Sequence, residues 1–157
     1  MRPDLPPIDK ARYRAAFMQL AQRSTFTHWL TLNTHRDCTV ATASKHLKRW
    51  RVEMFRRLHG QRFHEIAPDQ RTWYLGCPEL SAAGHPHFHL AVVIPEPVKL
   101  EFEAKFESRW KYIVRSGTSH LVPIGPTQDD QRVVLGYASK WLDPIADLPF
   151  VHSSVDW

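Results

Sequence analysis

The chain contains little cysteine and no long hydrophobic run. Its two cysteines, Cys38 and Cys77, lie 39 residues apart, and neither belongs to a CxxC pair, which argues against a disulfide framework and a cysteine zinc finger and favours a reducing, cytoplasmic setting. The longest aliphatic run, residues 90–94, has five residues, whereas a bilayer-spanning helix needs about 20. Residues 1–7 lack the apolar stretch of a signal peptide. We therefore expect no membrane partner and no export.

The 157 residues have about the length of one domain. Residues 1–157 are expected to form a single domain with a basic helical lead-in over residues 1–25 and an irregular tail over residues 143–157. Hydrophobic residues make up 43% and charged residues 24% of the chain, as in globular proteins. The positive charge is concentrated in residues 1–62, which hold 13 Lys and Arg against 4 Asp and Glu, while residues 63–157 hold 8 against 12. The first part is expected to contact phosphate, and the second supplies acids suited to a divalent-metal site.

Hydrophobic periodicity and turn residues predict an α+β domain. The expected helices cover residues 8–22, 42–59, 98–114 and 129–142. The expected strands cover residues 26–33, 71–77, 86–94 and 120–124. This order predicts a central antiparallel β-sheet with flanking helices packed on a face of the sheet.

The helix expected over residues 42–59 is strongly basic. Its apolar positions recur at three- and four-residue spacing, and six basic residues fill other positions: Lys45, Lys48, Arg49, Arg51, Arg56 and Arg57. Glu53 is its only acid, whereas a solvated helix usually mixes both signs to gain i,i+4 pairs. We interpret the six basic residues as a DNA-binding surface. The alternative is a basic surface with no nucleic-acid partner.

Three histidines occur within the five residues 85–89. On a strand, His87 and His89 point to the same face and present two imidazoles side by side, which predicts a pair of metal ligands. The alternative is a pair of hydrogen-bonded structural histidines. Glu79, placed at the start of the loop between the two strands, could return beside them as a third ligand, or it could be an exposed loop acid. Two imidazoles and one carboxylate suit Mn²⁺, Mg²⁺, Co²⁺ or Zn²⁺.

The last expected helix carries the run GYASKWL. Tyr137 and Lys140 stand at i and i+3, so a phenol and an ammonium would be neighbours on one helical face. A phenol that attacks phosphorus must lose a proton with an unperturbed pKa of about 10, and a nearby cation helps this loss. The alternative is a tyrosine at the edge of the core beside a lysine that extends to solvent.

Together these motifs resemble the HUH endonuclease superfamily, and in particular the replication initiators of rolling-circle replication (Rep proteins). The resemblance rests on FTHWLTLN, on Glu79 eight residues before the HFH of GHPHFHLAV, and on GYASKWL, and it covers residues 26–142. It implies a Rep-like, ferredoxin- or RRM-like catalytic domain, with His87, His89 and Glu79 as metal ligands, Tyr137 as the nucleophile and Lys140 as the lysine of the motif. The implied cofactor is a divalent metal ion, Mn²⁺ or Mg²⁺.

The activity implied by this resemblance is sequence-specific cleavage of single-stranded DNA or an origin hairpin. Attack by a single tyrosine leaves a 5′-phosphotyrosyl link and a free 3′-OH, which initiates and later terminates rolling-circle replication of a plasmid or phage. An HUH transposase or a mobilisation relaxase is an alternative with the same chemistry. A non-catalytic single-stranded nucleic-acid-binding module and a metal-dependent hydrolase that uses bound water are alternatives of other classes. No GxxxxGK[ST] motif is present, so a separate helicase would have to open the duplex, or the nuclease belongs to a longer protein.

Overall fold

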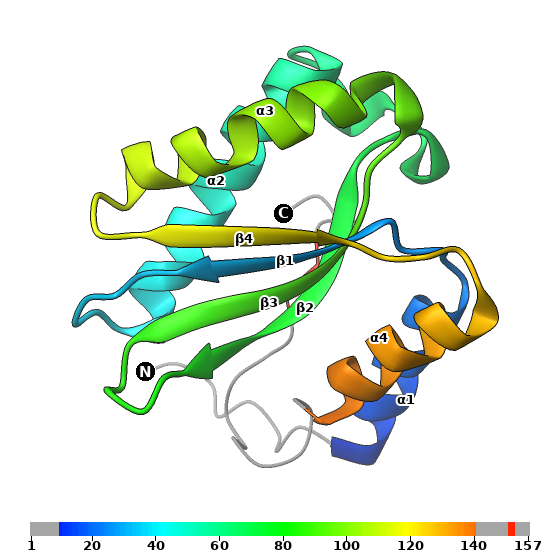
Figure 1. Cartoon of the computed structure of the whole chain (residues 1–157), viewed down its shortest axis with the longest axis horizontal. Coiled ribbons are helices and arrows are strands. Elements are labelled where there is room, and N and C mark those ends of the chain that lie inside the picture. Colours follow the sequence, from blue (N-terminus) through cyan, green and yellow to red (C-terminus); the bar gives the residue numbers. More distant parts are fainter. Residues whose placement is uncertain (1–9, 141–150, 153–157) are drawn as a thin grey trace, which may run out of the picture.

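The computed structural model describes residues 10–140 and 151–152 of the chain (Figure 1). The helices are α1 (Lys10–Gln22), α2 (Val40–His59), α3 (Glu96–Ile113) and α4 (Gln128–Lys140). The strands are β1 (His28–Asn33), β2 (Trp73–Leu80), β3 (Pro86–Val93), β4 (Thr118–Pro123) and β5 (Val151–His152). Two short 3-10 turns, Phe63–Glu65 and Pro68–Gln70, connect α2 to β2. No helix among the described residues is long and apolar enough to cross a membrane.

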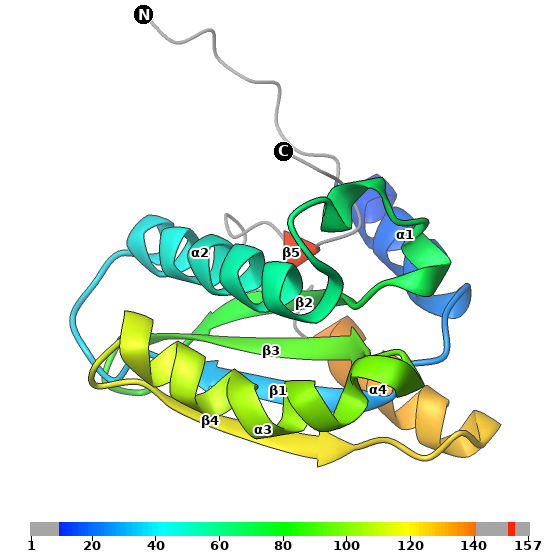
Figure 2. The same ribbon diagram turned by 90° about the horizontal axis from the view of Figure 1, so that it is seen from above.

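The strands form one antiparallel sheet in the order β4-β1-β3-β2-β5. The segment β1-α2-β2-β3-α3-β4 with strand order 4-1-3-2 is the ferredoxin-like arrangement of two interleaved βαβ units. The expected α+β fold with a central antiparallel sheet is therefore confirmed. Both crossover helices, α2 and α3, lie on the same side of the sheet (Figures 1 and 2).

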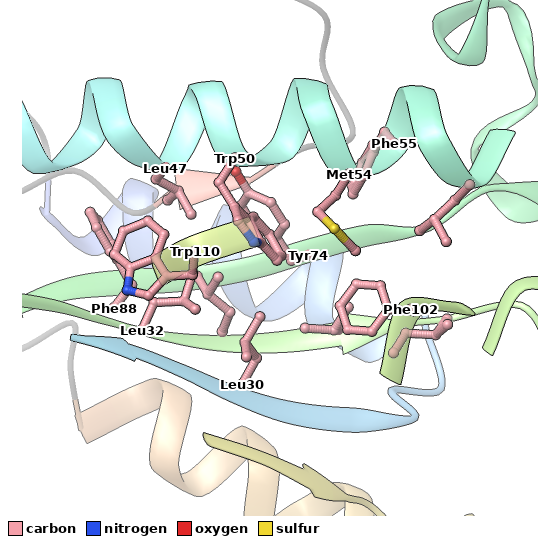
Figure 3. Packing of buried hydrophobic residues seen from close by; sticks show 14 of the residues in the cluster. Leu30, Leu32, Leu47, Trp50, Met54, Phe55, Tyr74, Phe88, Phe102 and Trp110 are labelled. Atoms are coloured by element: carbon pink, nitrogen blue, oxygen red, sulfur yellow. The ribbon is translucent and has the colours of Figure 1, made fainter. Parts of the chain in front are cut away.

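The main hydrophobic core lies between the sheet and the α2–α3 layer. Because side chains alternate along a strand, Leu30 and Leu32 of β1 point into this layer, as do Phe88, Leu90 and Val92 of β3. The core-facing stripes of α2 and α3 meet them with large side chains, which include Trp50, Met54, Phe55, Phe102 and Trp110 (Figure 3). The two indole N–H groups are satisfied, since Trp50 donates to Phe106 O at 3.1 Å and Trp110 donates to Asn33 O at 2.9 Å.

The opposite face of the sheet packs against α1 and α4. A second buried cluster joins Ala21 at the end of α1 and Val134 of α4 to Leu75, Cys77 and Ala91 on the strands. The amide of Gln131 fixes the start of α4 to the residue that leads into β1: Phe26 N donates to Gln131 Oε1, and Gln131 Nε2 donates to Phe26 O, both at 2.9 Å. The last helix is thereby held on the sheet face that carries the histidines.

Two parts of the expected fold need correction. Residues 71–77 were the expected second strand, but β2 continues through Pro78 to Leu80 and pairs along its whole length with β3. Proline is tolerated here because β2 borders the short strand β5, which pairs with it only at Leu75 and Gly76. The tail expected to be irregular over residues 143–157 contains that strand, Val151–His152. Residues 1–9, 141–150 and 153–157 lie outside the described part.

Acid is expected to destabilise the fold because several histidines are held neutral. Burial, the largest cause, lowers the pKa of His28, His46 and His59 below the value of 6.5. The unfolded chain therefore binds more protons below pH 6.5, so stability falls as the pH drops and levels off below the folded-state pKa values. We expect the melting temperature to fall by roughly 5 °C between pH 7.5 and pH 5.5 at constant ionic strength.

His59 supplies the internal control for this acid effect. Its Nε2 atom accepts a hydrogen bond from the Thr72 backbone N–H at 3.0 Å, which a protonated ring cannot do. The variant His59→Gln keeps an acceptor without a titrating group, so its melting temperature should depend less on pH. A melting temperature that is constant or rises toward pH 5.5 in the wild type would contradict this account.

Candidate active site

Glu79, His87 and His89 meet on the open part of one sheet face. The antiparallel register of β2 and β3 pairs Glu79 directly with His87, and it places Cys77 beside His89. The expectation that Glu79 lies in a loop is therefore wrong: it is a strand residue, and strand pairing itself brings the carboxylate to the histidines. The prediction that the three side chains come together is confirmed.

The three side chains converge on a common point. Glu79 Oε2 lies 2.8 Å from His87 Nε2 and 3.2 Å from His89 Nε2, and one ligand atom from each residue lies within 4.8 Å of the other two. The two imidazoles are perpendicular, with an interplanar angle of 88° and ring centroids 4.9 Å apart. Their side chains are 14% and 20% exposed and that of Glu79 is 25% exposed, so the site is partly shielded but reachable from solvent. This donor set fits a divalent cation with positions left open for oxygen ligands.

A neighbouring strand orients His89. Thr31 of β1 pairs with His89, and its Oγ1 lies 3.2 Å from His89 Nδ1. Trp29, two residues earlier on the same face, stacks on the imidazole with centroids 6.0 Å apart and an interplanar angle of 23°. If Nδ1 carries the proton and donates it to the threonine, the Nε2 lone pair faces Glu79 and is available to a metal.

Burial also favours the metal-binding form of His89. Desolvation lowers the pKa of this imidazole, the charge of His87 lowers it further, and Glu79 partly opposes both effects. A neutral imidazole is the form that binds a metal. For His87, the Nδ1 atom is buried and has no hydrogen-bond partner among the described residues, so the contact with Glu79 is what orients this ring.

Loss of the Thr31 hydroxyl is expected to weaken metal binding. The variant Thr31→Val keeps the shape and β propensity of the side chain but removes the hydrogen bond to His89 Nδ1. Removal of such an outer hydrogen bond typically lowers metal affinity by about 10- to 100-fold. Titration of the protein with Mn²⁺ by calorimetry measures the effect. Thr118→Val, at an exposed β4 position that faces the same side, is the matched control; equal affinities of both variants and the wild type would contradict this role of Thr31.

Tyr137 and Lys140 lie on the second half of α4. The helix begins with a reciprocal cap, in which Thr127 N donates to Asp130 Oδ2 at 3.3 Å and Asp130 N donates to Thr127 Oγ1 at 3.2 Å. The backbone of Tyr137 follows one turn after Val134, which is buried against the histidine-bearing face. The side chains of Tyr137 and Lys140 lie outside the described residues, so the predicted phenol–ammonium pair stays a prediction.

The six basic residues of α2 do not form one surface beside the cluster. Their helix covers the sheet face opposite to Glu79, His87 and His89, because Phe88 and Leu90 point toward α2 while the two histidines point away. Arg51 is 6% exposed and its charge acts on the buried phenol of Tyr74, so its assignment as a DNA contact is wrong.

The other five basic residues of α2 differ in their partners. Arg49 pairs with Glu53 and Arg57 pairs with Glu101 of α3, each at 2.8 Å. Lys45, Lys48 and Arg56 are exposed, so they are the positions at which the predicted phosphate contacts remain open.

Several residues near the cluster were absent from the prediction. Asn33 pairs with His87, and Thr31 pairs with His89; on its other side Thr31 pairs with His120 of β4. The alternation of polar and apolar residues in HWLTLN, which is typical of a strand with two different faces, was the available signal for these positions. His85, the third histidine of the run, stands apart from the cluster, with its Nε2 atom 3.3 Å from Asp37 Oδ1.

Comparisons with known proteins agree with this fold and site. A crystal structure of the hypothetical protein ORF119 from Sulfolobus islandicus rod-shaped virus 1 matches with a TM-score of 0.51 and 14% sequence identity, over 83% of this chain and 95% of that one. At this identity the likeness concerns the fold. The comparison with curated proteins finds no match. The family model of the replication-associated protein ORF2 matches residues 27–142, which include every strand of the sheet except β5 and the whole Glu79–His87–His89 cluster. The chain belongs to this family of replication-associated proteins.

Proposed function

We propose that this protein is a metal-dependent endonuclease that nicks and rejoins single-stranded DNA through Tyr137. In this proposal it initiates and terminates rolling-circle replication of a plasmid or phage. The observation that carries the proposal is the convergence of one carboxylate and two imidazoles on a sheet face of a replication-associated protein. A structural role alone does not account for two half-buried imidazoles that share one carboxylate oxygen.

The proposed reaction is attack by Tyr137 Oη on the phosphorus of one phosphodiester. A P–Oη bond forms as the P–O3′ bond breaks; the phenol loses its proton and the departing O3′ atom gains one. The products are a 5′-phosphotyrosyl link and a free 3′-OH. Because the covalent link conserves the energy of the phosphodiester, attack by a 3′-OH reverses the step and joins two ends without ATP.

Each proposed active-site residue has a separate task. Glu79, His87 and His89 would hold a divalent ion, Mn²⁺ or Mg²⁺, which supplies Lewis-acid stabilisation of the negative charge on the phosphate when it is bound. Lys140 would favour the phenolate of Tyr137 through its positive charge. The Gln131–Phe26 hydrogen bonds would hold α4 against the sheet, so that the tyrosine and the cluster act on the same phosphate.

Cleavage of end-labelled DNA tests this proposal. Single-stranded pools labelled at the 5′ or the 3′ end are incubated with the protein in Mn²⁺ or in EDTA and separated on denaturing gels. We expect Mn²⁺-dependent cleavage in which the 3′ fragment migrates with the protein until it is digested with protease. Cleavage with two free fragments would favour a hydrolase that uses bound water, and binding without cleavage of any pool would favour a non-catalytic binding module. Transfer to a second element rather than religation of a circle would favour a transposase or relaxase.

The exposed basic residues of α2 are expected to contact DNA that flanks the nick. Since α2 lies on the opposite layer, it would meet the stem of an origin hairpin rather than the strand at the cluster. In the triple variant Lys45→Gln, Lys48→Gln, Arg56→Gln, the slope of log affinity against log salt for a hairpin should become less negative by about 2 to 3 units. Affinity for a short single strand should change little. Arg62→Gln, an exposed charge outside α2, is the control, and an unchanged slope in the triple variant would contradict the contact.

A further inference from the structure

A cavity of about 490 Å³ opens beside the cluster, between the outer face of β1 and β4 and the first turns of α4. Its lining includes Trp29, Thr31, His120, Val122, Asp130 and Val133. This volume is within the range of about 300 to 1,000 Å³ that is typical of small-ligand sites. The cavity is not part of the proposed nicking chemistry, which uses the cluster and Tyr137.

The cavity shares a wall with the metal-binding cluster. Trp29 and Thr31 line the cavity, and both contact His89, through ring stacking at 6.0 Å and through the 3.2 Å contact of Thr31 Oγ1 with His89 Nδ1. His120 continues the same row, because β4 pairs it with Thr31. A group seated in the cavity would therefore lie directly beside a phosphate held at Glu79, His87 and His89.

The chemistry of the lining selects a nucleobase rather than a phosphate. Trp29 offers an aromatic face, and Val122 and Val133 offer aliphatic surface, which suit the stacking of a planar base. Among the described residues the lining contains one carboxylate, Asp130, and no lysine or arginine, so a phosphate would be repelled. The base would have to be unstacked from its neighbours, as single-stranded DNA allows at little cost.

Asp130 favours a base that carries an amino group. One oxygen of its carboxylate, Oδ2, accepts from Thr127 N, and Oδ1 is the second acceptor of the same group. A carboxylate accepts from the exocyclic amine of cytosine, and adenine and guanine carry amines that can donate in the same way. Thymine has no exocyclic amine.

We propose that this cavity holds one nucleobase next to the scissile phosphate and selects cytosine, adenine or guanine over thymine at that position. The inference rests on the proposed function and deepens it, because it assigns a step of target recognition to residues of β1, β4 and α4. The occupant is a base of the single strand that crosses the cluster.

Selection and abasic scanning in EDTA test the inference without cleavage. A randomised single-stranded DNA pool is selected for binding to the wild-type protein, and the selected sequence is rebuilt with one abasic site at each position in turn. We expect one position that excludes thymine and at which loss of the base weakens binding about tenfold. The variant Asp130→Asn keeps an acceptor for Thr127 but should change the base preference at that position alone.

A cavity-filling variant completes the test. Val133 is 59% exposed at the cavity, so Val133→Phe should fill the space without disturbing the core, and it should weaken binding of the intact strand about tenfold while leaving the abasic strand unaffected. Leu100→Phe, at an exposed position of α3 on the other layer, is the matched control and should bind like the wild type. Melting curves confirm that each variant is folded.

The outcomes separate this inference from the nuclease proposal. Cleavage through Tyr137 with base preferences that are identical in the wild type, Asp130→Asn and Val133→Phe would overturn the base cavity and leave the nuclease intact. A preference that both variants alter, without cleavage in Mn²⁺, would support the cavity and overturn the nuclease. Absence of any binding to single-stranded DNA would overturn both.

Discussion

Replacement of Tyr137 by phenylalanine is expected to abolish DNA cleavage while DNA and metal binding stay at the wild-type level. The substitution removes one oxygen atom from α4 and keeps the aromatic ring. Loss of a nucleophile typically lowers the rate by more than about a thousandfold, since no other group can form the covalent intermediate. The measurement is the rate of adduct formation on a cleavable single strand in Mn²⁺, alongside binding affinity in EDTA.

The matched control for Tyr137→Phe is Tyr112→Phe. Tyr112 is 66% exposed on α3, where the guanidinium groups of Arg49 and Arg109 stack on its ring at 5.7 and 5.6 Å. It lies in the α2–α3 layer, away from the cluster. Wild-type cleavage by Tyr137→Phe would overturn the assignment of the nucleophile, and loss of cleavage in Tyr112→Phe alone would transfer the role to that residue.

Removal of one ligand from the cluster is expected to eliminate metal-dependent activity. The substitution His89→Ala removes an imidazole, and Glu79→Gln replaces a charged donor by a neutral one. Mn²⁺ affinity should fall by about 100-fold or more for each variant, on the order of 3 kcal/mol, because three protein ligands become two or lose their negative charge. Cleavage should disappear at low Mn²⁺, and single-strand binding in EDTA should be preserved.

His85→Ala is the control for the ligand variants. His85 precedes β3 and contacts Asp37 rather than the cluster, so its loss should leave Mn²⁺ affinity unchanged. Calorimetric titration with Mn²⁺ and melting curves in EDTA distinguish a lost ligand from a lost fold. Equal Mn²⁺ affinity of the wild type and His89→Ala would show that the cluster is structural.

Local periodicity explains why the histidine pair could be predicted. On any strand His87 and His89 share a face, so their proximity depends on neither register nor topology. The position of Glu79 depends on register, and the strand was expected to end before Pro78, which placed the carboxylate in a loop. The eight-residue spacing was right because a tight reversal between Leu80 and Pro86 brings residues at that separation opposite each other.

The error at Arg51 could have been avoided. Arg51 follows Leu47 by four residues and precedes Met54 by three, so it belongs to the same helical stripe as the buried residues of α2. Charge alone suggested an exposed position, but the stripe indicates burial. The face of the sheet that α2 covers, in contrast, depends on the path of the crossover from β1 to β2 and is not encoded in the residues of the helix.

The cavity beside the cluster could not be predicted from the sequence. Trp29, His120 and Asp130 come from three elements that are far apart in the chain, and only the pairing of β1 with β4 and the docking of α4 bring them together. No spacing in the sequence encodes these long-range contacts. Side chains that act through such contacts are found only once the topology is known.

Peptide mapping of the covalent protein–DNA adduct tests the central claim most directly. The wild-type protein is incubated with a cleavable single strand in Mn²⁺, digested with trypsin and nuclease, and analysed by mass spectrometry. The account predicts a nucleotide adduct on the peptide of residues 133–140, located at Tyr137, and no adduct in EDTA. Cleavage with no adduct on any peptide, or an adduct on a different tyrosine, would contradict it.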